Sequence, residues 1–356
     1  MTDKRAPHGF NTRVVHAGEA PDPVTGAVGV PVYQSATFAF RSAEQIDRFN
    51  EGQVPHYIYS RYGNPTVRCL ELKLADLEGA GDVVLAASGM AAISTAMLHL
   101  LAGGGHVVAS DTLYPIARTF FREGLGDYGA SATMVDATDL DAVRAAIGEH
   151  TRAVYVETFS NPTLDVMDIP ALAEIAHVAG VPLVVDNTFL SPALYRPLEH
   201  GADLVLHSAT KYLSGHSNMI GGMIAGSRET VGAIRRRIEQ LGGIMAPQTA
   251  WQLMQGVKTL PLRMAQHSTS ALAVAEAMAA HPSVESVNYP GLPEHPGHEM
   301  AAGMTGNRFS GMVSLRLADH ARSRNVFLDA LEIPYNAVRL GGVESLVWPF
   351  DGEGGI

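Results

Sequence analysis

Short apolar runs alternate with helix-like segments through the middle of the chain. The apolar spacing from 65 to 79 is helical and ends at a glycine, and a second helix is expected near 139–148. Buried strands are expected at 83–87, 106–110, 132–135, 153–157, 181–185 and 204–206. This rhythm predicts an α/β fold with a mainly parallel sheet flanked by helices, and ligands at the carboxyl ends of the strands.

The pattern changes on both sides of this region. Residues 1–60 are rich in Pro, Gly, His and aromatics with little periodicity, so we expect an extended arm that rests on another surface. Helical character dominates from about 228 to 280, and a smaller C-terminal α/β domain follows from near His281. Its expected elements are strands at 284–287 and 311–317 and a helix at about 320–331. The predicted units are an arm at 1–60, a large domain at 61–255, and a connector helix with the small domain at 256–356.

Composition narrows the class of protein. The 356 residues are 46% hydrophobic and 17% charged, enough to bury a large core. The formal net charge is -11 without a basic block, which argues against nucleic acid and anionic membrane surfaces as partners. A single cysteine, Cys69, excludes an internal disulfide framework. Because the start lacks an apolar signal core and no run is long enough to span a bilayer, we expect a cytoplasmic protein.

One lysine follows an apolar run directly, in a turn rather than on a helix. The run at 204–206 leads through His-Ser-Ala-Thr to Lys211, in a segment rich in Gly, Ser and His. A lysine at the mouth of a sheet can lose solvation, which lowers its pKa and lets it form a Schiff base with a carbonyl. The alternative is a solvated lysine that follows a strand by chance.

An aspartate ends the preceding expected strand. Asp186 closes the run at 181–185, where a buried carboxylate is costly unless a cation is its partner. A protonated pyridinium nitrogen would be such a partner. Asp186 with a Schiff-base Lys211 is therefore the pair that pyridoxal phosphate (PLP) requires, because the ring is an electron sink only while its nitrogen is protonated.

With these residues the chain resembles the PLP-dependent Cys/Met-metabolism (transsulfuration) enzymes of fold type I. The similarity runs from about Thr12 to about Leu346 and rests on several motifs in the same order. The group includes cystathionine γ-synthase, cystathionine γ- and β-lyases, methionine γ-lyase and O-acylhomoserine sulfhydrylases. The resemblance implies a fold type I transferase with PLP as cofactor, an amino-acid substrate, and a homodimer with shared active sites that usually pairs into a homotetramer.

Two motifs would hold the cofactor phosphate. The stretch 57–66 resembles the family's Tyr-Ser-Arg-x-x-Asn-Pro-Thr motif, in which Tyr59 and Arg61 would reach the phosphate in the neighbouring subunit. Arginine suits this task because its planar fork donates two parallel hydrogen bonds. In the turn that opens the next helix, Gly89 and Met90 would cradle the same phosphate through free backbone N–H groups.

The resemblance assigns roles to five more positions. Tyr114 matches a tyrosine that stacks on the ring and can protonate a departing group. Asn161, in a Glu-Thr-Phe-Ser-Asn-Pro motif, should donate to the phenolic oxygen of PLP and touch the substrate carboxylate. Ser208 and Thr210 match phosphate-binding hydroxyls, and Lys211 is the Schiff-base lysine and general base.

The chain departs from the family pattern near the expected site. Pro115 replaces a glycine, although it could equally begin the following helix; Phe159 replaces a proline, and Asn218 replaces an aspartate. Arg339 stands where a serine normally lies beside the substrate, which brings a cation into the pocket. Val338 is apolar where cystathionine-handling members often have glutamate. Together these changes suggest a substrate outside ordinary methionine metabolism.

The end of the sequence leaves two interpretations open. Beyond Leu346 the family continues to an Arg-Leu-Ser-x-Gly motif whose arginine clamps the substrate α-carboxylate, whereas this sequence stops at residues 354–356. Either the sequence is cut short and the small domain is incomplete, or the clamp is absent and Arg339 replaces it. We favour the first, because losing the last strand and helix would expose apolar surface.

The predicted function is γ-elimination or γ-replacement on a γ-substituted L-amino acid, of the homoserine or methionine type or an analogue from a specialised pathway. Lys211 would be the base and Tyr114 the candidate acid. The alternatives are a β-lyase acting on cystathionine or cysteine and a non-catalytic PLP-fold binding protein. His295 and His298 lack nearby cysteines or paired acids, which favours a solvated loop over a metal site. Three glycines at 103–105 follow a helix and lack a dinucleotide fingerprint.

Overall fold

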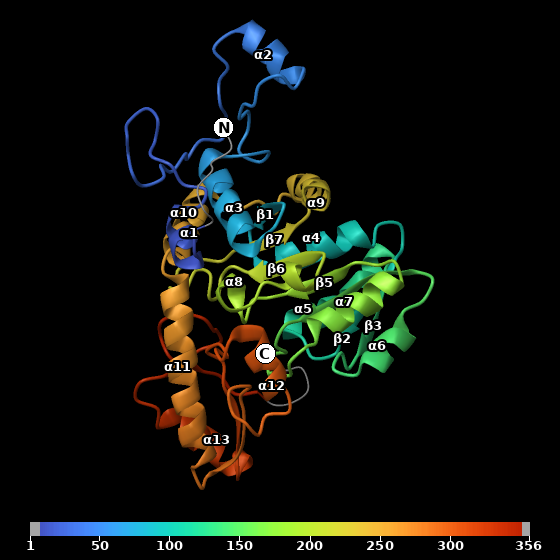
Figure 1. Cartoon of the computed structure of the whole chain (residues 1–356), viewed down its shortest axis with the longest axis vertical. Coiled ribbons are helices and arrows are strands. Elements are labelled where there is room, and N and C mark those ends of the chain that lie inside the picture. The colour runs from blue at the N-terminus through green and yellow to red at the C-terminus, as the bar shows by residue number, and fades with distance from the viewer. Residues whose placement is uncertain (1–7, 351–356) are drawn as a thin grey trace.

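A seven-stranded sheet lies at the centre of the computed structural model, which describes residues 8–350 apart from the side chains of 320–323 (Figure 1). The strand order is β1-β7-β6-β5-β4-β2-β3. The strands are β1 Asp82–Ala86, β2 His106–Ser110, β3 Ser131–Val135, β4 Thr151–Glu157, β5 Leu183–Asp186, β6 Leu204–Ser208 and β7 Gly222–Gly226. Neighbouring strands from β6 to β3 are parallel, and β7 runs antiparallel to both β1 and β6. The predicted α/β class with a mainly parallel sheet is confirmed.

Helices cover both faces of this sheet, which is why β4, β5 and β6 are apolar and buried almost throughout. One core lies under α4, α5 and α9, and the other lies under α3, α7, α10 and α11. The helices of this region are α3 Pro65–Glu78, α4 Gly89–Leu100, α5 Pro115–Arg122, α6 Leu140–Ala146, α7 Ile169–Val178 and α8 Ser191–Leu194, with 3-10 turns η1 Gly124–Tyr128 and η2 Pro197–His200. Side chains alternate along each strand, so residues two apart face the same core.

The sequence pattern missed β7 because its five residues begin and end with glycine, which weakens any strand signal. Those glycines are needed for close packing: a Cβ on Gly222 would lie 2.2 Å from the backbone oxygen of Ser88. The predicted helical region from 228 to 280 consists of three helices, α9 Arg228–Leu241, α10 Pro247–Val257 and α11 Leu260–Ala279. Gly242, in a left-handed conformation with φ +79°, ends α9.

After α11 the chain forms two small sheets. Strands β8 Val284–Asn288 and β9 Ser314–Leu317 pair antiparallel, and β10 Tyr335–Asn336 pairs parallel with β11 Leu346–Val347. Helices α12 His298–Thr305 and α13 His320–Asp329 complete this part (Figure 1). Strand β9 begins three residues later than the predicted 311. The sequence end at 354–356, on which two interpretations were left open, lies outside the described residues.

The N-terminal segment contains two short helices that the sequence pattern did not indicate, α1 Phe10–His16 and α2 Ala43–Asn50. Helix α1 packs against α3 through the buried side chain of Val14, whereas α2 lies far from the central sheet (Figure 1). Between them Val24 and Val28 are 90% and 83% exposed. Across residues 8–350, no helix has both the length and the apolar character needed to cross a membrane.

Candidate active site

The loop after β6 presents Lys211 at the carboxyl end of the sheet. Its backbone N–H donates to the carbonyl of Ser208 at 3.2 Å, and its carbonyl accepts from Gly215 N–H at 2.8 Å, which curls the loop. Thr210 ties the loop to the start of β7, because its hydroxyl exchanges hydrogen bonds with both backbone groups of Gly221. Burial, followed by the nearby charge of Arg339, lowers the pKa of Lys211. The neutral form of the amine is therefore more populated at Lys211 than at a solvated lysine.

Two carboxylates end neighbouring strands beside this loop. Asp186 closes β5 and Glu157 closes β4, and the two residues are register partners. Asp186 accepts the backbone N–H of Thr188 at 2.9 Å, and the Glu157 Oε1 atom accepts the backbone N–H of Tyr114 at 2.8 Å. Burial raises the pKa of both carboxyls. The sequence reasoning assigned no role to Glu157, although β4 ends in an acid just as β5 does.

The start of α4 meets the end of β6. The Ser88 side chain caps α4 by accepting from Ala91 N–H at 3.0 Å, and the next two residues of the helix are Gly89 and Met90. A Cβ on Gly89 would lie 2.9 Å from Cβ and 3.0 Å from Oγ of Ser208, so the helix start and Ser208 are in direct contact. First-turn N–H groups beside a hydroxyl form a site suited to an anion such as phosphate.

Tyr114 and Asn161 lie in the loops that follow β2 and β4. Tyr114 immediately precedes α5, the residue is 40% exposed, and its backbone is held by Glu157. Asn161 is half-buried and precedes a cis proline. Two of the departures have local explanations: Pro115 is the first residue of α5, where its missing N–H costs nothing, and Phe159 is 1% exposed in the core.

Arg339 comes from the C-terminal part of the chain and lies against the lysine loop. Its Nη2 donates to the carbonyl of Thr210, while its Nε is buried without a hydrogen-bond partner among the described residues. Burial lowers the pKa of Arg339. Nearby, Glu344 accepts from the Ser217 hydroxyl at 2.8 Å, which joins the same two segments. Exposed Asn218 accepts from the Ser214 hydroxyl at 3.3 Å.

Within one chain, Tyr59 and Arg61 make no contact with the lysine loop that the hydrogen bonds or ion pairs of the described residues record. The Arg61 guanidinium lies 5.1 Å from the ring centre of Tyr59 and 5.0 Å from that of Tyr62, and all three side chains are exposed. Their predicted role, to reach the phosphate of a neighbouring subunit, stays a prediction.

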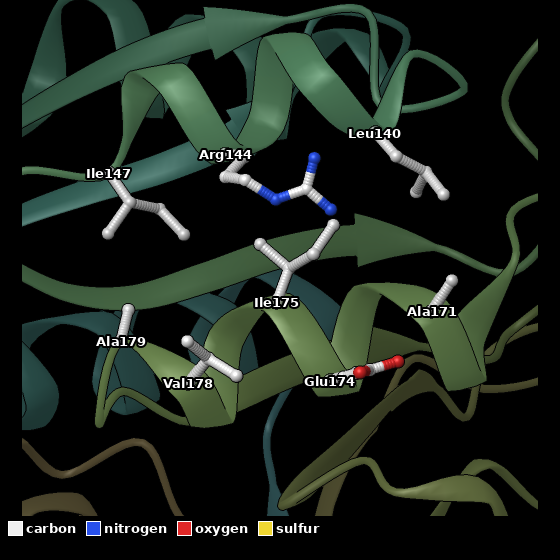
Figure 2. A pocket seen from close by; sticks show the side chains of 8 residues that line it. All are labelled: Leu140, Arg144, Ile147, Ala171, Glu174, Ile175, Val178 and Ala179. Atoms are coloured by element: carbon white, nitrogen blue, oxygen red, sulfur yellow. The ribbon is translucent and has the colours of Figure 1, made fainter.

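A surface groove lies between α6 and α7, and its lining includes none of the site residues named above (Figure 2). Arg144 points into the gap between the two helices, and most of the other lining side chains are apolar (Figure 2). It is lined by Leu140, Arg144, Ile147, Ala171, Glu174, Ile175, Val178 and Ala179. Because it offers no buried nucleophile or acid, we assign the chemistry to the strand ends instead.

The chain is similar to known proteins over almost its whole length. The model of the family "Cys/Met metabolism PLP-dependent enzyme" matches residues 11–349. The chain is 41% identical over 340 residues to L-methionine gamma-lyase from Pseudomonas putida, covering 95% of this chain and 85% of the relative. It is 43% identical over 352 residues to cystathionine gamma-synthase from Mycobacterium tuberculosis, covering 98% and 89%. The crystal structure of MetB from Corynebacterium glutamicum matches with a TM-score of 0.91 at 37% identity, covering 96% of this chain and 87% of that one.

The chain therefore belongs to the Cys/Met metabolism PLP-dependent enzymes. The family, the fold type I class, the enzymatic nature and the cofactor predicted from the motifs are confirmed. The residues present also fit PLP chemically. Lys211 is a half-buried amine with a lowered pKa, Asp186 is a buried acid without an ion-pair partner among the described residues, and the start of α4 lies against Ser208.

Proposed function

We propose that this enzyme catalyses γ-elimination or γ-replacement on a γ-substituted L-amino acid. The observation that carries the proposal is the half-buried Lys211 amine, with its lowered pKa, just after β6, in a chain whose relatives include both a gamma-lyase and a gamma-synthase. Both names denote reactions at the γ-carbon. A reaction of this kind needs a base that can act more than once on neighbouring carbons, and a neutral lysine amine on a short loop suits that demand.

In this proposal six residues of one chain hold the cofactor. Lys211 holds it covalently through Nζ, and Asp186 balances the proton on its ring nitrogen. Asn161 donates to its phenolic oxygen. The phosphate lies at the start of α4, against the N–H groups of Gly89 and Met90 and the hydroxyl of Ser208. The case for Thr210 as a phosphate ligand is weaker, because its hydroxyl already forms hydrogen bonds with the backbone of Gly221.

When bound, pyridoxal phosphate accepts the electron pair left when the α-proton is removed. Lys211 would take that proton on Nζ. Its lowered pKa favours the neutral form needed for this step. Tyr114 is the candidate acid for the departing γ-substituent, because the residue is partly exposed while its backbone is fixed by Glu157.

Substrate recognition is assigned to Asn161 and Arg339. The Arg339 guanidinium keeps an unpartnered Nε while one terminal nitrogen is anchored on Thr210. A guanidinium so held can bind a carboxylate of the substrate through its remaining donors. The cation supports our proposal of an unusual γ-substituted substrate from outside ordinary methionine metabolism.

Tyr59 and Arg61 are proposed to complete the site of a second copy of the chain, in a homodimer that pairs into a homotetramer. Their exposure, together with that of Val24 and Val28, supports an arm that rests on another subunit. We propose the cytoplasm as the compartment, where the single thiol Cys69 stays reduced. Burial raises the pKa of Cys69 to about 11, which keeps it in the unreactive thiol form.

The deciding experiment follows the visible absorption of the PLP-loaded enzyme while γ-substituted and β-substituted L-amino acids are added, with the released keto acid identified by mass spectrometry. A spectral change with 2-oxobutyrate or its substituted analogue supports γ-chemistry and identifies the leaving group. Pyruvate instead would establish a β-lyase. Full efficiency on cystathionine or an O-acylhomoserine would refute the specialised substrate. As a control, Lys211→Ala should lose any borohydride-reducible link to the cofactor.

A further inference from the structure

Glu157 and Asp186 form a pair of buried acids on one face of the sheet. They are register partners on adjacent parallel strands, which lie about 4.8 Å apart, and the common register points both side chains the same way. Each residue is only 7% exposed. Like charges at this spacing in a buried site cannot both persist without compensating cations.

Among the described residues no cation forms an ion pair with either acid, and the charge of His207 reaches Asp186 only from the opposite face of the sheet. Their charged or polar neighbours on β4 and β6 are Tyr155 and His207. Tyr155 is fully buried on the same face, and burial with the two adjacent acids raises the pKa of its phenol, so it is neutral. His207 points to the opposite face, because strand side chains alternate, and its Nε2 lies 2.6 Å from Oε1 of Glu78. Any positive charge on His207 is thus balanced by Glu78.

The cofactor brings one positive charge, on its ring nitrogen, and this site holds two carboxyls. If Asp186 balances that nitrogen, as proposed above, Glu157 must carry a proton to remain buried. The Tyr114 N–H that bonds to Oε1 lowers the pKa of Glu157, but burial and the charge of Asp186 raise it by more. A neutral acid can keep this bond, with Oε1 as its carbonyl oxygen and the proton on the other oxygen.

We propose that Glu157 is a permanently neutral carboxylic acid that donates its proton in a hydrogen bond to Asp186 and holds the Tyr114 backbone with its other oxygen. Glu157 is therefore a positioning residue, which acts through Asp186 and Tyr114. This inference rests on the role proposed for Asp186 and is independent of whether the reaction occurs at the γ- or the β-carbon.

The test compares Glu157→Gln with Glu157→Leu. Glutamine reproduces a neutral acid, since its amide oxygen can accept from Tyr114 and its NH₂ can donate to Asp186. Leucine has similar bulk and makes neither bond. We expect Glu157→Gln to keep the PLP dissociation constant within about 3-fold and to leave unchanged the pH midpoint of the bound cofactor's visible band. Glu157→Leu should weaken PLP binding roughly 10-fold or more, because Asp186 loses the proposed donor and the Tyr114 N–H loses its acceptor.

An infrared measurement checks the protonation state directly. The PLP-loaded wild type, with carbon-13 in its glutamate side chains, should show the carbonyl band of a protonated acid at neutral pH, and Glu157→Gln should lack it. Absence of the band in the wild type overturns the proposal even if both variants misfold. A midpoint lowered in both variants would mean that an anionic Glu157 had stabilised the protonated cofactor, which also overturns it. The proposal is also overturned if Glu157→Leu has the same PLP dissociation constant and the same pH midpoint as wild type.

The proposed function and this inference can fail separately. If Asp186→Asn binds PLP as tightly as wild type and leaves its spectrum unchanged, the role of Asp186 is wrong and this inference falls with it. If Asp186→Asn is defective while both Glu157 variants behave as wild type, only the inference fails.

Discussion

Arg339 donates a hydrogen bond from Nη2 to the backbone carbonyl of Thr210, the residue directly before Lys211. Two further contacts fasten this C-terminal segment to the lysine loop. A Cβ on Gly341 would lie 2.5 Å from the backbone nitrogen of Tyr212, and the N–H of Val343 donates to the carbonyl of Gly215 at 3.1 Å. The Arg339 charge is therefore held beside Lys211 by backbone contacts on both sides.

Replacing Arg339 by Gln should raise the pKa of Lys211, because a neighbouring cation disfavours the ammonium form and its removal relieves that effect. Cofactor binding to the apoenzyme requires the neutral amine, so its rate constant should reach a plateau at higher pH in Arg339→Gln than in wild type. The rise is measured by stopped-flow absorbance across pH. Arg339→Lys keeps the charge and should leave the midpoint unchanged; a shift equal to that of Gln would show that charge is not the cause.

The same pair of variants separates charge from geometry in substrate binding. Lysine lacks the planar fork, so Arg339→Lys should raise KM for the best substrate nearly as much as Arg339→Gln, by about 10-fold. A KM unchanged in both would remove Arg339 from the substrate site.

Mixing two inactive variants tests the shared site. Lys211→Ala removes the base of its own chain, and Arg61→Ala removes the group proposed to reach the neighbouring subunit. Hybrid dimers formed by dissociation and reassociation contain one intact site, so a mixture in equal amounts should recover about a quarter of wild-type activity. Each parent treated alone is the control. No recovery in a mixture shown by mass spectrometry to contain hybrids would place Arg61 in its own chain's site.

The sequence predicted what depends on local pattern. Apolar runs indicated strands β1 to β6 because both faces of the sheet are covered, and chemical groups at two strand ends pointed to Asp186 and Lys211. The sequence pattern could not predict contacts between segments that are distant along the chain. Glu157 meets Tyr114, 43 residues away, and Arg339 meets Thr210 across 129 residues, so no periodicity can indicate either contact. Strand β7 was missed for a different reason, since its terminal glycines serve close packing rather than strand propensity.

Gly89→Ala should impair cofactor binding without unfolding the protein. The added carbon would lie 2.9 Å from Cβ of Ser208, so the start of α4 must move away from β6 and its N–H groups lose their position. We expect PLP affinity to fall about 10-fold, measured by fluorescence titration of the apoenzyme. Gly232→Ala in α9 is the matched control, since nothing lies within 4 Å of its Cβ. It should leave PLP affinity unchanged and stabilise the helix by up to about 1 kcal/mol.

Lys73 anchors the N-terminal segment to α3, and its loss should be costly. This lysine is fully buried, its Nζ donates to the carbonyls of Val14 at 2.9 Å and Val15 at 3.0 Å, and it pairs with Glu19 at 3.0 Å. Burial lowers the pKa of Lys73, and the contact with Glu19 opposes that effect. Lys73→Met fills similar volume but leaves the three oxygens without this donor. We expect a loss of about 3 kcal/mol in the free energy of unfolding.

Lys258→Met is the control for Lys73→Met, because it removes another ion pair of Glu19 without removing a buried lysine. Lys258 also pairs with Glu19, at 2.8 Å, but its side chain is 26% exposed. Its removal leaves Glu19 with its buried partner, so the loss should be about 1 kcal/mol. Denaturant titration of the PLP-loaded proteins at one protein concentration measures both, and trypsin cleavage before residue 62 reports release of the arm. If both variants lose the same free energy of unfolding, Lys73 stabilises the fold through its ion pair with Glu19 and not through its hydrogen bonds to the carbonyls of α1. Cleavage unchanged in Lys73→Met would contradict the anchoring role itself.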